Sequence, residues 1–133
     1  MNHESHERHE KLLYPDEVFG IQGAVFAVYA TLGAGFLEGV YQECLAIEFE
    51  ARGIPFAALH SLPLSYRGRP LRHSYVADFV CFDRIILELK AVREIAPEHR
   101  AQTLNYLKAS GLRLGLLVNF GALPKVKIER FAL

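Results

Sequence analysis

The sequence has few cysteines and no long apolar run. Cys44 and Cys81 are its only cysteines, and each stands in apolar sequence far from the other. We expect reduced core thiols of a cytoplasmic protein, not a disulfide or a metal-binding pair. No segment has the pattern of a signal peptide. The longest apolar run, residues 24–37, is too short and too interrupted by glycine to span a membrane.

The sequence also lacks an excess of charge. Its 15 Lys and Arg balance 15 Asp and Glu. Nucleic-acid-binding proteins are usually basic, so the balance counts against that function, although local charge matters more than the total. Repeats and internal linkers are absent too, and 133 residues that are 51% hydrophobic predict one domain with a real core. We expect a flexible polar tail over residues 1–13 and the domain over residues 14–133.

The apolar spacing predicts three helices and five strands. Prolines stand near the starts of two of the helices, and glycines follow the ends of all three. The order α-α-β-β-β-α-β-β predicts an α/β fold with a central mixed β-sheet flanked by helices. The helices are expected at 14–32, 38–52 and 97–110, and the strands at 56–66, 71–82, 85–92, 112–120 and 125–131.

Three charged residues interrupt the most apolar part of the chain, residues 75–92. Asp78 lies in one predicted strand, and Glu88 and Lys90 lie in the next. Burying a carboxylate or an ammonium group is costly unless the charge is paired or binds a metal. One explanation is an internal ion pair between Glu88 and Lys90 without a function. The other is a metal-dependent site that cleaves phosphodiester bonds.

The second explanation requires one particular strand register. Side chains alternate between the faces of a strand, so Glu88 and Lys90 share a face. Opposed residues of an antiparallel pair also share a face. A two-residue turn at 83–84 would place Asp78 opposite Leu89, on the wrong face. A three-residue loop over 82–84, or a bulge, places Asp78 opposite Glu88.

An Asp on one strand followed by Glu-x-Lys on the next resembles the PD-(D/E)xK nuclease superfamily, whose core is restriction-endonuclease-like. The pattern falls on Asp78, Glu88 and Lys90, with Ala77 where the family often has proline. The stretch QTLNY, residues 102–106, resembles the Q-x-x-x-Y motif of RecB-type members. The resemblance implies a metal-dependent nuclease.

Three further motifs resemble the GxxExxY proteins of that superfamily. They are GFLEGVY at 35–41, HRAQTLNYL at 99–107 and GLLVNFG at 115–121. Their order along one small chain matches the family pattern over nearly everything after Tyr14. The resemblance therefore predicts a PD-(D/E)xK nuclease-like domain over residues 14–133.

The resemblance also assigns roles to residues. Mg²⁺, with Mn²⁺ as a substitute, is a hard cation that prefers carboxylate oxygens and keeps several waters. We expect Asp78 and Glu88 to bind it directly, together with the backbone carbonyl of Leu89. Glu38 joins the site directly or through water by resemblance to related nucleases. A first-turn acid favoured by the helix dipole explains Glu38 equally well.

The remaining predicted roles are positioning and support. Lys90 is expected to position the attacking water or to neutralise charge on the scissile phosphate. Gln102, on the following helix, is expected to orient water or phosphate. Tyr106 lies one helical turn after Gln102 and is expected to pack beneath the site. Tyr41 is expected to be mainly structural.

A basic cluster on the predicted hairpin is the last candidate. It consists of Arg67, Arg69, Arg72 and His73. Ordinary surface charge is one interpretation, and contact with a nucleic-acid backbone is the other.

Two functions from different classes remain open. The first is a Mg²⁺-dependent nuclease that acts on nucleic acid, with DNA preferred, and the complete set of Asp78, Glu88 and Lys90 favours it. The second is a non-catalytic module on the same fold that binds nucleic acid or a protein. The small size and neutral charge favour a protein partner, a homodimer or a specialised substrate. We expect no association with a membrane.

Overall fold

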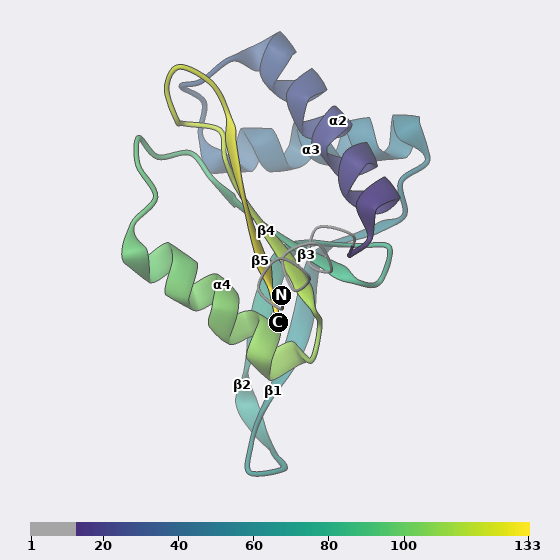
Figure 1. Ribbon diagram of the computed structural model, residues 1–133, viewed down its shortest axis with the longest axis vertical. Helices are drawn as coiled ribbons and strands as arrows, with labels where there is room; N and C mark the ends of the chain where they lie inside the picture. Colours follow the sequence, from purple (N-terminus) through teal and green to yellow (C-terminus); the bar gives the residue numbers. More distant parts are fainter. Residues whose placement is uncertain (1–12) are drawn as a thin grey trace, which may run out of the picture.

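The computed structural model describes residues 13–133, so nearly all of the predicted tail lies outside the described residues. The elements follow the predicted order (Figure 1). The helices are α2 (Pro15–Leu32), α3 (Glu38–Arg52) and α4 (Pro97–Ser110); the strands are β1 (Phe56–Tyr66), β2 (Arg69–Cys81), β3 (Ile85–Lys90), β4 (Leu114–Asn119) and β5 (Lys127–Ala132).

The helix ends follow local signals in the sequence. Pro15 occupies the first turn of α2, where its missing N–H costs no hydrogen bond. Gly53 ends α3 and Gly111 ends α4, both with the left-handed backbone that glycine adopts without strain. At the start of α4, the N–H of Ala96 donates to Nδ1 of His99 at 3.1 Å.

The strands form one mixed sheet in the order β1-β2-β3-β4-β5. All neighbours are antiparallel except β3 and β4, which are parallel and joined through α4. Helices α2 and α3 cover one face of the sheet, and α4 covers the other (Figure 1). The α/β fold with a mixed sheet is therefore confirmed.

Several strand ends differ from the prediction by one or two residues. β2 begins at Arg69 instead of Leu71, because the turn that precedes it is only Arg67 and Gly68. Both turn residues have positive φ, 49° and 77°, as tight hairpin turns require. β3 ends at Lys90, because the N–H of Val92 donates to a side chain and not to a neighbouring strand.

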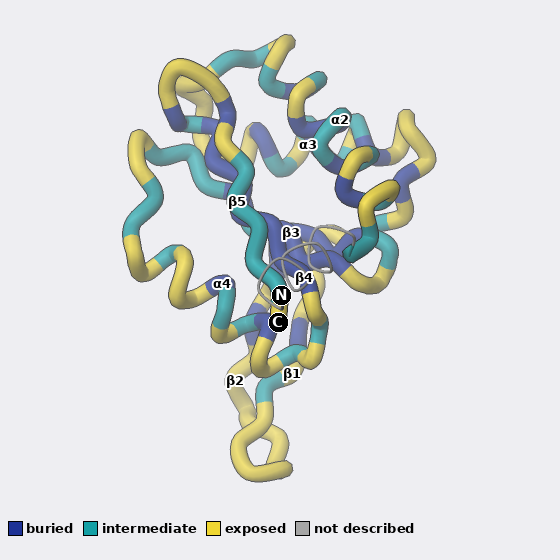
Figure 2. Tube along the Cα trace, viewed as in Figure 1, coloured by how far each residue is buried: buried dark blue, intermediate teal, exposed yellow. Residues whose placement is uncertain are grey.

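Each face of the sheet carries its own apolar cluster. The cluster beneath α2 and α3 contains Leu87 and Leu89 of β3, whereas Ile86 packs on the opposite side near Leu107 of α4. Figure 2 shows that β4 is buried along its length and β3 along most of it, with Glu88 and Lys90 half-buried. Glu88 and Lys90 alternate with Leu87 and Leu89, so their side chains leave the larger cluster.

The β1–β2 hairpin extends beyond both clusters. Residues 65–74, here called the arm, are exposed throughout and project from the body of the molecule (Figure 2). Within residues 13–133, no helix combines the length and apolar character needed to cross a bilayer. Cys81 is buried and Cys44 is half-buried, and neither forms a disulfide.

Candidate active site

The loop between β2 and β3 sets the register on which the site depends. Cys81 pairs with Ile85, and Phe79 pairs with Leu87. Residues 82–84 therefore form a three-residue loop, closed by the N–H of Arg84, which donates to the carbonyl of Cys81 at 3.0 Å. Continued by one residue, the register sets Asp78 opposite Glu88. This is the arrangement that the metal-dependent interpretation requires.

At that position, side chains replace the backbone ladder. The N–H of Leu89 donates to Oδ2 of Asp78 at 2.8 Å. The backbone N–H of Asp78 lies near the carboxylate of Glu88, whose pKa it lowers. The Asp78 carboxylate thus bonds to the backbone of β3, and the two acids lie close together where β2 and β3 stop pairing.

Both carboxylates are poorly solvated. Burial raises the pKa of Glu88 to about 7, and the Asp78 N–H and the Lys90 charge oppose the rise only in part. Burial also raises the pKa of Asp78, against the opposing effects of the Leu89 N–H and Lys90. Two desolvated carboxylates gain most from a cation that shares them.

Lys90 lies beside these acids without closing an ion pair. Its positive charge lowers the pKa values of Glu38, Asp78 and Glu88, so its ammonium lies near all three. Within residues 13–133, however, no carboxylate oxygen lies within 4 Å of that ammonium. A closed ion pair between Glu88 and Lys90 therefore does not account for the buried charges.

Glu38 approaches from the other side of the cleft. It is the first residue of α3 and is exposed, yet it lines a pocket of about 230 Å³ together with Asp78. Partial burial and the charge of Asp78 raise its pKa, while Lys90 and His99 lower it. Glu38 is thus both a first-turn acid and a neighbour of the site. Gly39, Gln42 and Leu59 complete the pocket lining.

Tyr41 fixes the segment that leads to Glu38. It is fully buried, its hydroxyl donates to the carbonyl of Gly33, and it accepts the N–H of Phe36 at 3.3 Å. Its ring stacks on Phe120 with centroids 4.3 Å apart. Tyr41 therefore connects the start of α3 to the end of β4, and its hydroxyl is occupied by two hydrogen bonds to the protein backbone.

The two candidates on α4 differ in their surroundings. Tyr106 stacks on Tyr75 of β2, and burial together with the negative charge of Glu88 raises its pKa. Its ring therefore lies close to the site. Gln102 is exposed, and in the part of the chain that the structure describes it has no hydrogen bond to the carboxylates.

Asn119, for which no role was predicted, holds the segment that follows Lys90. Its Oδ1 accepts hydrogen bonds from the N–H groups of Val92 and Gly121, both at 3.0 Å. The N–H of Phe120 donates to the carbonyl of Lys90 at 2.8 Å. A Cβ at Gly121 would lie 2.5 Å from the nitrogen of Val92, so only glycine fits. Asn119 and Gly121 both belong to the motif GLLVNFG at 115–121, so the motif already contained the residues that make these contacts.

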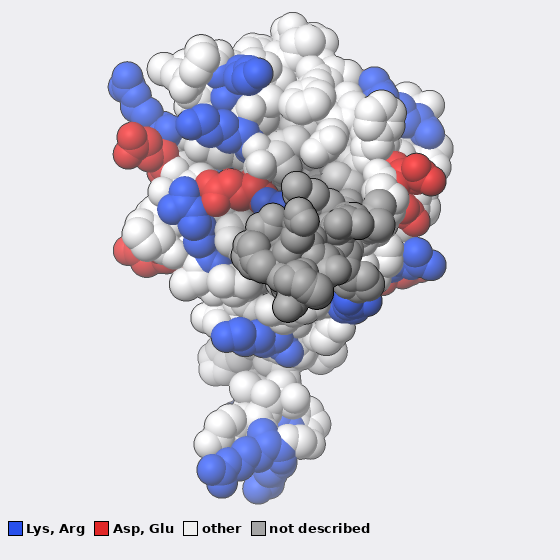
Figure 3. Space-filling model, in the orientation of Figure 1, with Lys and Arg blue, Asp and Glu red and all other residues white. Residues whose placement is uncertain are grey.

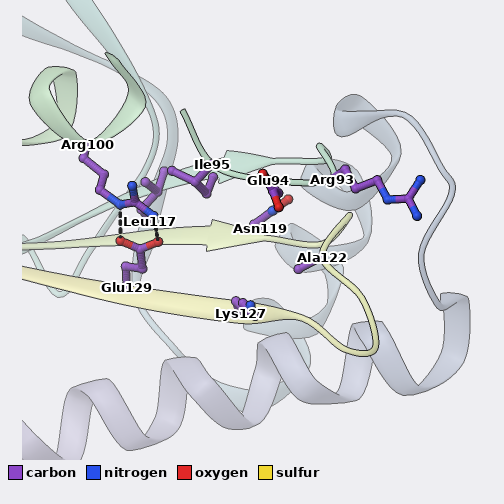
Figure 4. Close-up of a pocket in the computed structure, with 9 residues that line it drawn as sticks. All are labelled: Arg93, Glu94, Ile95, Arg100, Leu117, Asn119, Ala122, Lys127 and Glu129. Atoms are coloured by element: carbon purple, nitrogen blue, oxygen red, sulfur yellow. Dashed lines mark hydrogen bonds and ion pairs between the residues drawn. The ribbon is translucent and has the colours of Figure 1, made fainter. Parts of the chain in front are cut away.

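A second pocket, of about 370 Å³, lies beyond Asn119 toward β5 (Figure 4). Arg100 donates to both carboxylate oxygens of Glu129, at 2.7 and 2.9 Å, which neutralises both charges. Arg93 points away from the other lining residues (Figure 4). The pocket does not contain Asp78 or Glu88, so we do not assign the chemistry to it.

The donor set was compared with the needs of a divalent cation. Within residues 13–133, no three His, Cys, Asp or Glu side chains are grouped to hold a metal. Mg²⁺, however, is usually bound through one or two carboxylates, with waters and substrate phosphate completing its shell. Asp78 and Glu88 provide two such oxygen donors side by side. The residues present therefore fit a hard cation of this kind.

Comparison with known proteins supports this interpretation at the level of the family. A profile described as the PD-(D/E)XK nuclease superfamily matches residues 15–131. Comparison with curated proteins gave no match.

Two solved structures are similar to the chain. SSO0001 has a TM-score of 0.55 at 17% identity, over 90% of this chain and 59% of that one. An alkaline exonuclease, LHK-Exo, from Laribacter hongkongensis has a TM-score of 0.46 at 12% identity, over 65% of this chain and 51% of that one. The chain thus spans between half and two thirds of their lengths.

Proposed function

This chain belongs to the PD-(D/E)XK nuclease superfamily, and on that premise we propose that it hydrolyses phosphodiester bonds of nucleic acid, with DNA as the preferred substrate. Members of the superfamily generally use divalent metal ions. The observation that carries the proposal is the close approach of Asp78 and Glu88 between β2 and β3, with the ammonium of Lys90 beside them and more than 4 Å from every carboxylate oxygen of residues 13–133. The motifs at 35–41 and 115–121 support placement in the GxxExxY group.

Asp78 and Glu88 hold the cation in this proposal. The backbone carbonyl of Leu89 and the carboxylate of Glu38 are the further oxygen donors that we assign to it. Mg²⁺ is the expected ion, with Mn²⁺ as its substitute. When bound, such an ion polarises the phosphate and lowers the pKa of a bound water.

Lys90 supplies the positive charge of the protein itself. Its ammonium has no carboxylate partner within 4 Å among residues 13–133, so it is free to interact with the charge that develops on the scissile phosphate. Gln102 is exposed on α4 and is assigned to orienting water or phosphate at the open side. Tyr41 and Tyr106 act as supports, because their contacts are to the protein.

The arm is the proposed contact for the rest of the nucleic acid. Arg67, Arg69, Arg72 and His73 are all exposed, and residues 51–77 contain no Asp or Glu. Figure 3 shows basic side chains and no acidic ones at the end of the arm. A surface of one sign attracts the phosphate backbone without specifying sequence.

A non-catalytic binding module is the second candidate. Two observations favour it: the third acid, Glu38, is exposed, and Phe19 and Phe26 on α2 are 78% and 52% exposed. An exposed apolar surface of this kind suits a second copy of the chain or another protein. The free cysteines support our placement of the protein in the cytoplasm.

A cleavage assay decides between the two candidates. Single-stranded, duplex and branched DNA, and RNA, are incubated with the protein in Mg²⁺, in Mn²⁺ and in EDTA. We expect cleavage that needs the metal and disappears in Asp78→Asn. Binding to nucleic acid without cleavage of any form, in either metal, would establish the binding module instead. Activity that persists in Asp78→Asn or in EDTA would show a contaminating nuclease.

A further inference from the structure

Leu59 has a backbone conformation that leucine normally avoids. Its φ is 50°, in the left-handed region, where a side chain is crowded by the backbone. The other non-glycine residues with positive φ among residues 13–133 are Tyr14, Arg67, Phe82 and Asp83, and all four lie at a helix start or in a turn. Leu59 alone lies inside a strand.

The strained residue stands directly across from Asp78. On β1 and β2, Ala58 pairs with Phe79 and His60 pairs with Ala77, and no pair forms between Leu59 and Asp78. Strand β1 is therefore distorted at the point where β2 carries the first acid of the site. The result is the pocket of about 230 Å³ that Leu59 lines together with Glu38 and Asp78.

Among residues 13–133, neither apolar cluster provides packing for Leu59 that would compensate for the strain. Leu59 is 61% exposed and belongs to neither apolar cluster. Left-handed non-glycine residues persist where the surroundings enforce them, and they concentrate at functional sites. An exposed leucine on a distorted backbone beside two acids is therefore better explained by a ligand than by the stability of the fold.

We propose that Leu59 is a positioning residue whose isobutyl group packs against a nucleobase next to the phosphate that would be bound through a cation at Asp78 and Glu88. The ligand class is an unpaired or unstacked nucleotide, because the side chain is apolar and can contact only the face of a base or a sugar. Apolar side chains insert against bases in this way in other nucleic-acid complexes. This inference rests on the proposed function, since it needs nucleic acid at the site.

The test measures binding, so that it does not depend on cleavage. Ca²⁺ replaces Mg²⁺, and fluorescence anisotropy gives the Kd for two single-stranded oligonucleotides of one length, one with bases and one abasic throughout. The wild type should bind the base-bearing strand more tightly by about tenfold, the size expected for burying most of a leucine side chain. Leu59→Asn should bring this ratio close to one, because asparagine tolerates positive φ but lacks the apolar surface.

Further variants separate the contact from the fold. Leu59→Met should keep the ratio. Leu59→Gly should lose the ratio while raising the melting temperature by a few degrees, because glycine removes the strain. Ile47→Asn is the matched control: Ile47 is 60% exposed on α3, nine residues from Glu38, and its change should leave the ratio intact.

The outcomes are separable. An Asn variant that keeps the wild-type ratio overturns the role of Leu59, whether or not the protein cleaves DNA. A wild type that binds both strands equally also overturns it. A wild type that distinguishes the strands through Leu59 but cleaves nothing in Mg²⁺ or Mn²⁺ leaves the role of Leu59 standing and refutes the nuclease proposal.

Discussion

Replacing Glu88 by glutamine should stabilise the metal-free protein at alkaline pH and remove its response to divalent cations. Glu88 is half-buried, and burial raises its pKa from 4.5 to about 7. Below pH 4.5 the carboxyl is protonated in both the folded and the unfolded state. Between pH 4.5 and 7 the folded state holds a proton that the unfolded state has lost, so the free energy of unfolding falls as pH rises.

The size of the effect follows from the shift. One pKa unit corresponds to about 1.4 kcal/mol, so a rise from 4.5 to about 7 corresponds to about 3.5 kcal/mol. A half-buried carboxylate keeps some water, which reduces the expected loss to roughly 2–3 kcal/mol between pH 4.5 and pH 7.5. For a chain of this length, each kcal/mol moves the melting temperature by roughly 3–5 °C.

The assay is urea unfolding in EDTA at several pH values, on the wild type and on Glu88→Gln. The difference between the two proteins cancels the histidines and other groups that titrate in the same range. We expect the free energy of unfolding of the variant to gain roughly 2–3 kcal/mol on the wild type between pH 4.5 and 7.5. The melting temperature of Glu88→Gln should likewise rise relative to that of the wild type over this pH range.

Adding Mg²⁺ then tests the site itself. At pH 8, a cation at ten times its Kd should stabilise the wild type by about 1.4 kcal/mol, and it should do so far less at pH 5, where Glu88 is protonated. Glu88→Gln should show no such response. Parallel pH profiles of the two proteins would refute the desolvation argument. A wild type that never responds to metal would refute the cation site while leaving the buried carboxylate in place.

Three further outcomes are expected. Lys90→Ala should lower Mg²⁺-dependent cleavage about a hundredfold or more, because the variant loses a charge that stabilises the transition state. Its melting temperature should change little, because Lys90 has no ion-pair partner within 4 Å among residues 13–133. A large loss of stability together with an inert wild type would favour the binding module. Changing the three arm arginines to serine should reduce the slope of log K against log salt by up to about 2.7, and Arg52→Ser, the control, should not. Glu38→Gln should weaken Mn²⁺ binding in calorimetric titration, and equal affinity would leave Glu38 as a first-turn acid only.

The elements could be predicted because their ends depend on local chemistry. Gly53 and Gly111 end helices through their own backbone freedom, and Pro15 begins one through its fixed φ, so no tertiary information is needed. The start of β2 and the end of β3 were harder to predict from the sequence. They depend on how far the Arg67–Gly68 turn tightens and on where Asn119 captures the N–H of Val92, which is a long-range contact.

The register of the site was predicted from chemistry rather than from strand propensity. Turn statistics alone allowed either two or three residues between β2 and β3. Requiring Asp78 and Glu88 to share a face selected three, and the pairing of Cys81 with Ile85 agrees. What the sequence could not provide is the hydrogen bond from the Leu89 N–H to the Asp78 carboxylate, or the strain at Leu59. Both arise from the separation of neighbouring strands, which has no local pattern.

Total charge was the least informative feature of the sequence. A net charge of zero counted against nucleic-acid binding, yet residues 51–77 carry no acid, and the acids of the site, Glu38, Asp78 and Glu88, lie outside that stretch. From Arg69 at the arm to Asp78, β2 runs nine residues, or roughly 30 Å at 3.3 Å per residue. The Debye length at physiological salt is about 8 Å, so the acids of the site screen little of the positive field at the arm. A phosphate backbone near the arm therefore meets a basic surface, whatever the sum over the whole chain.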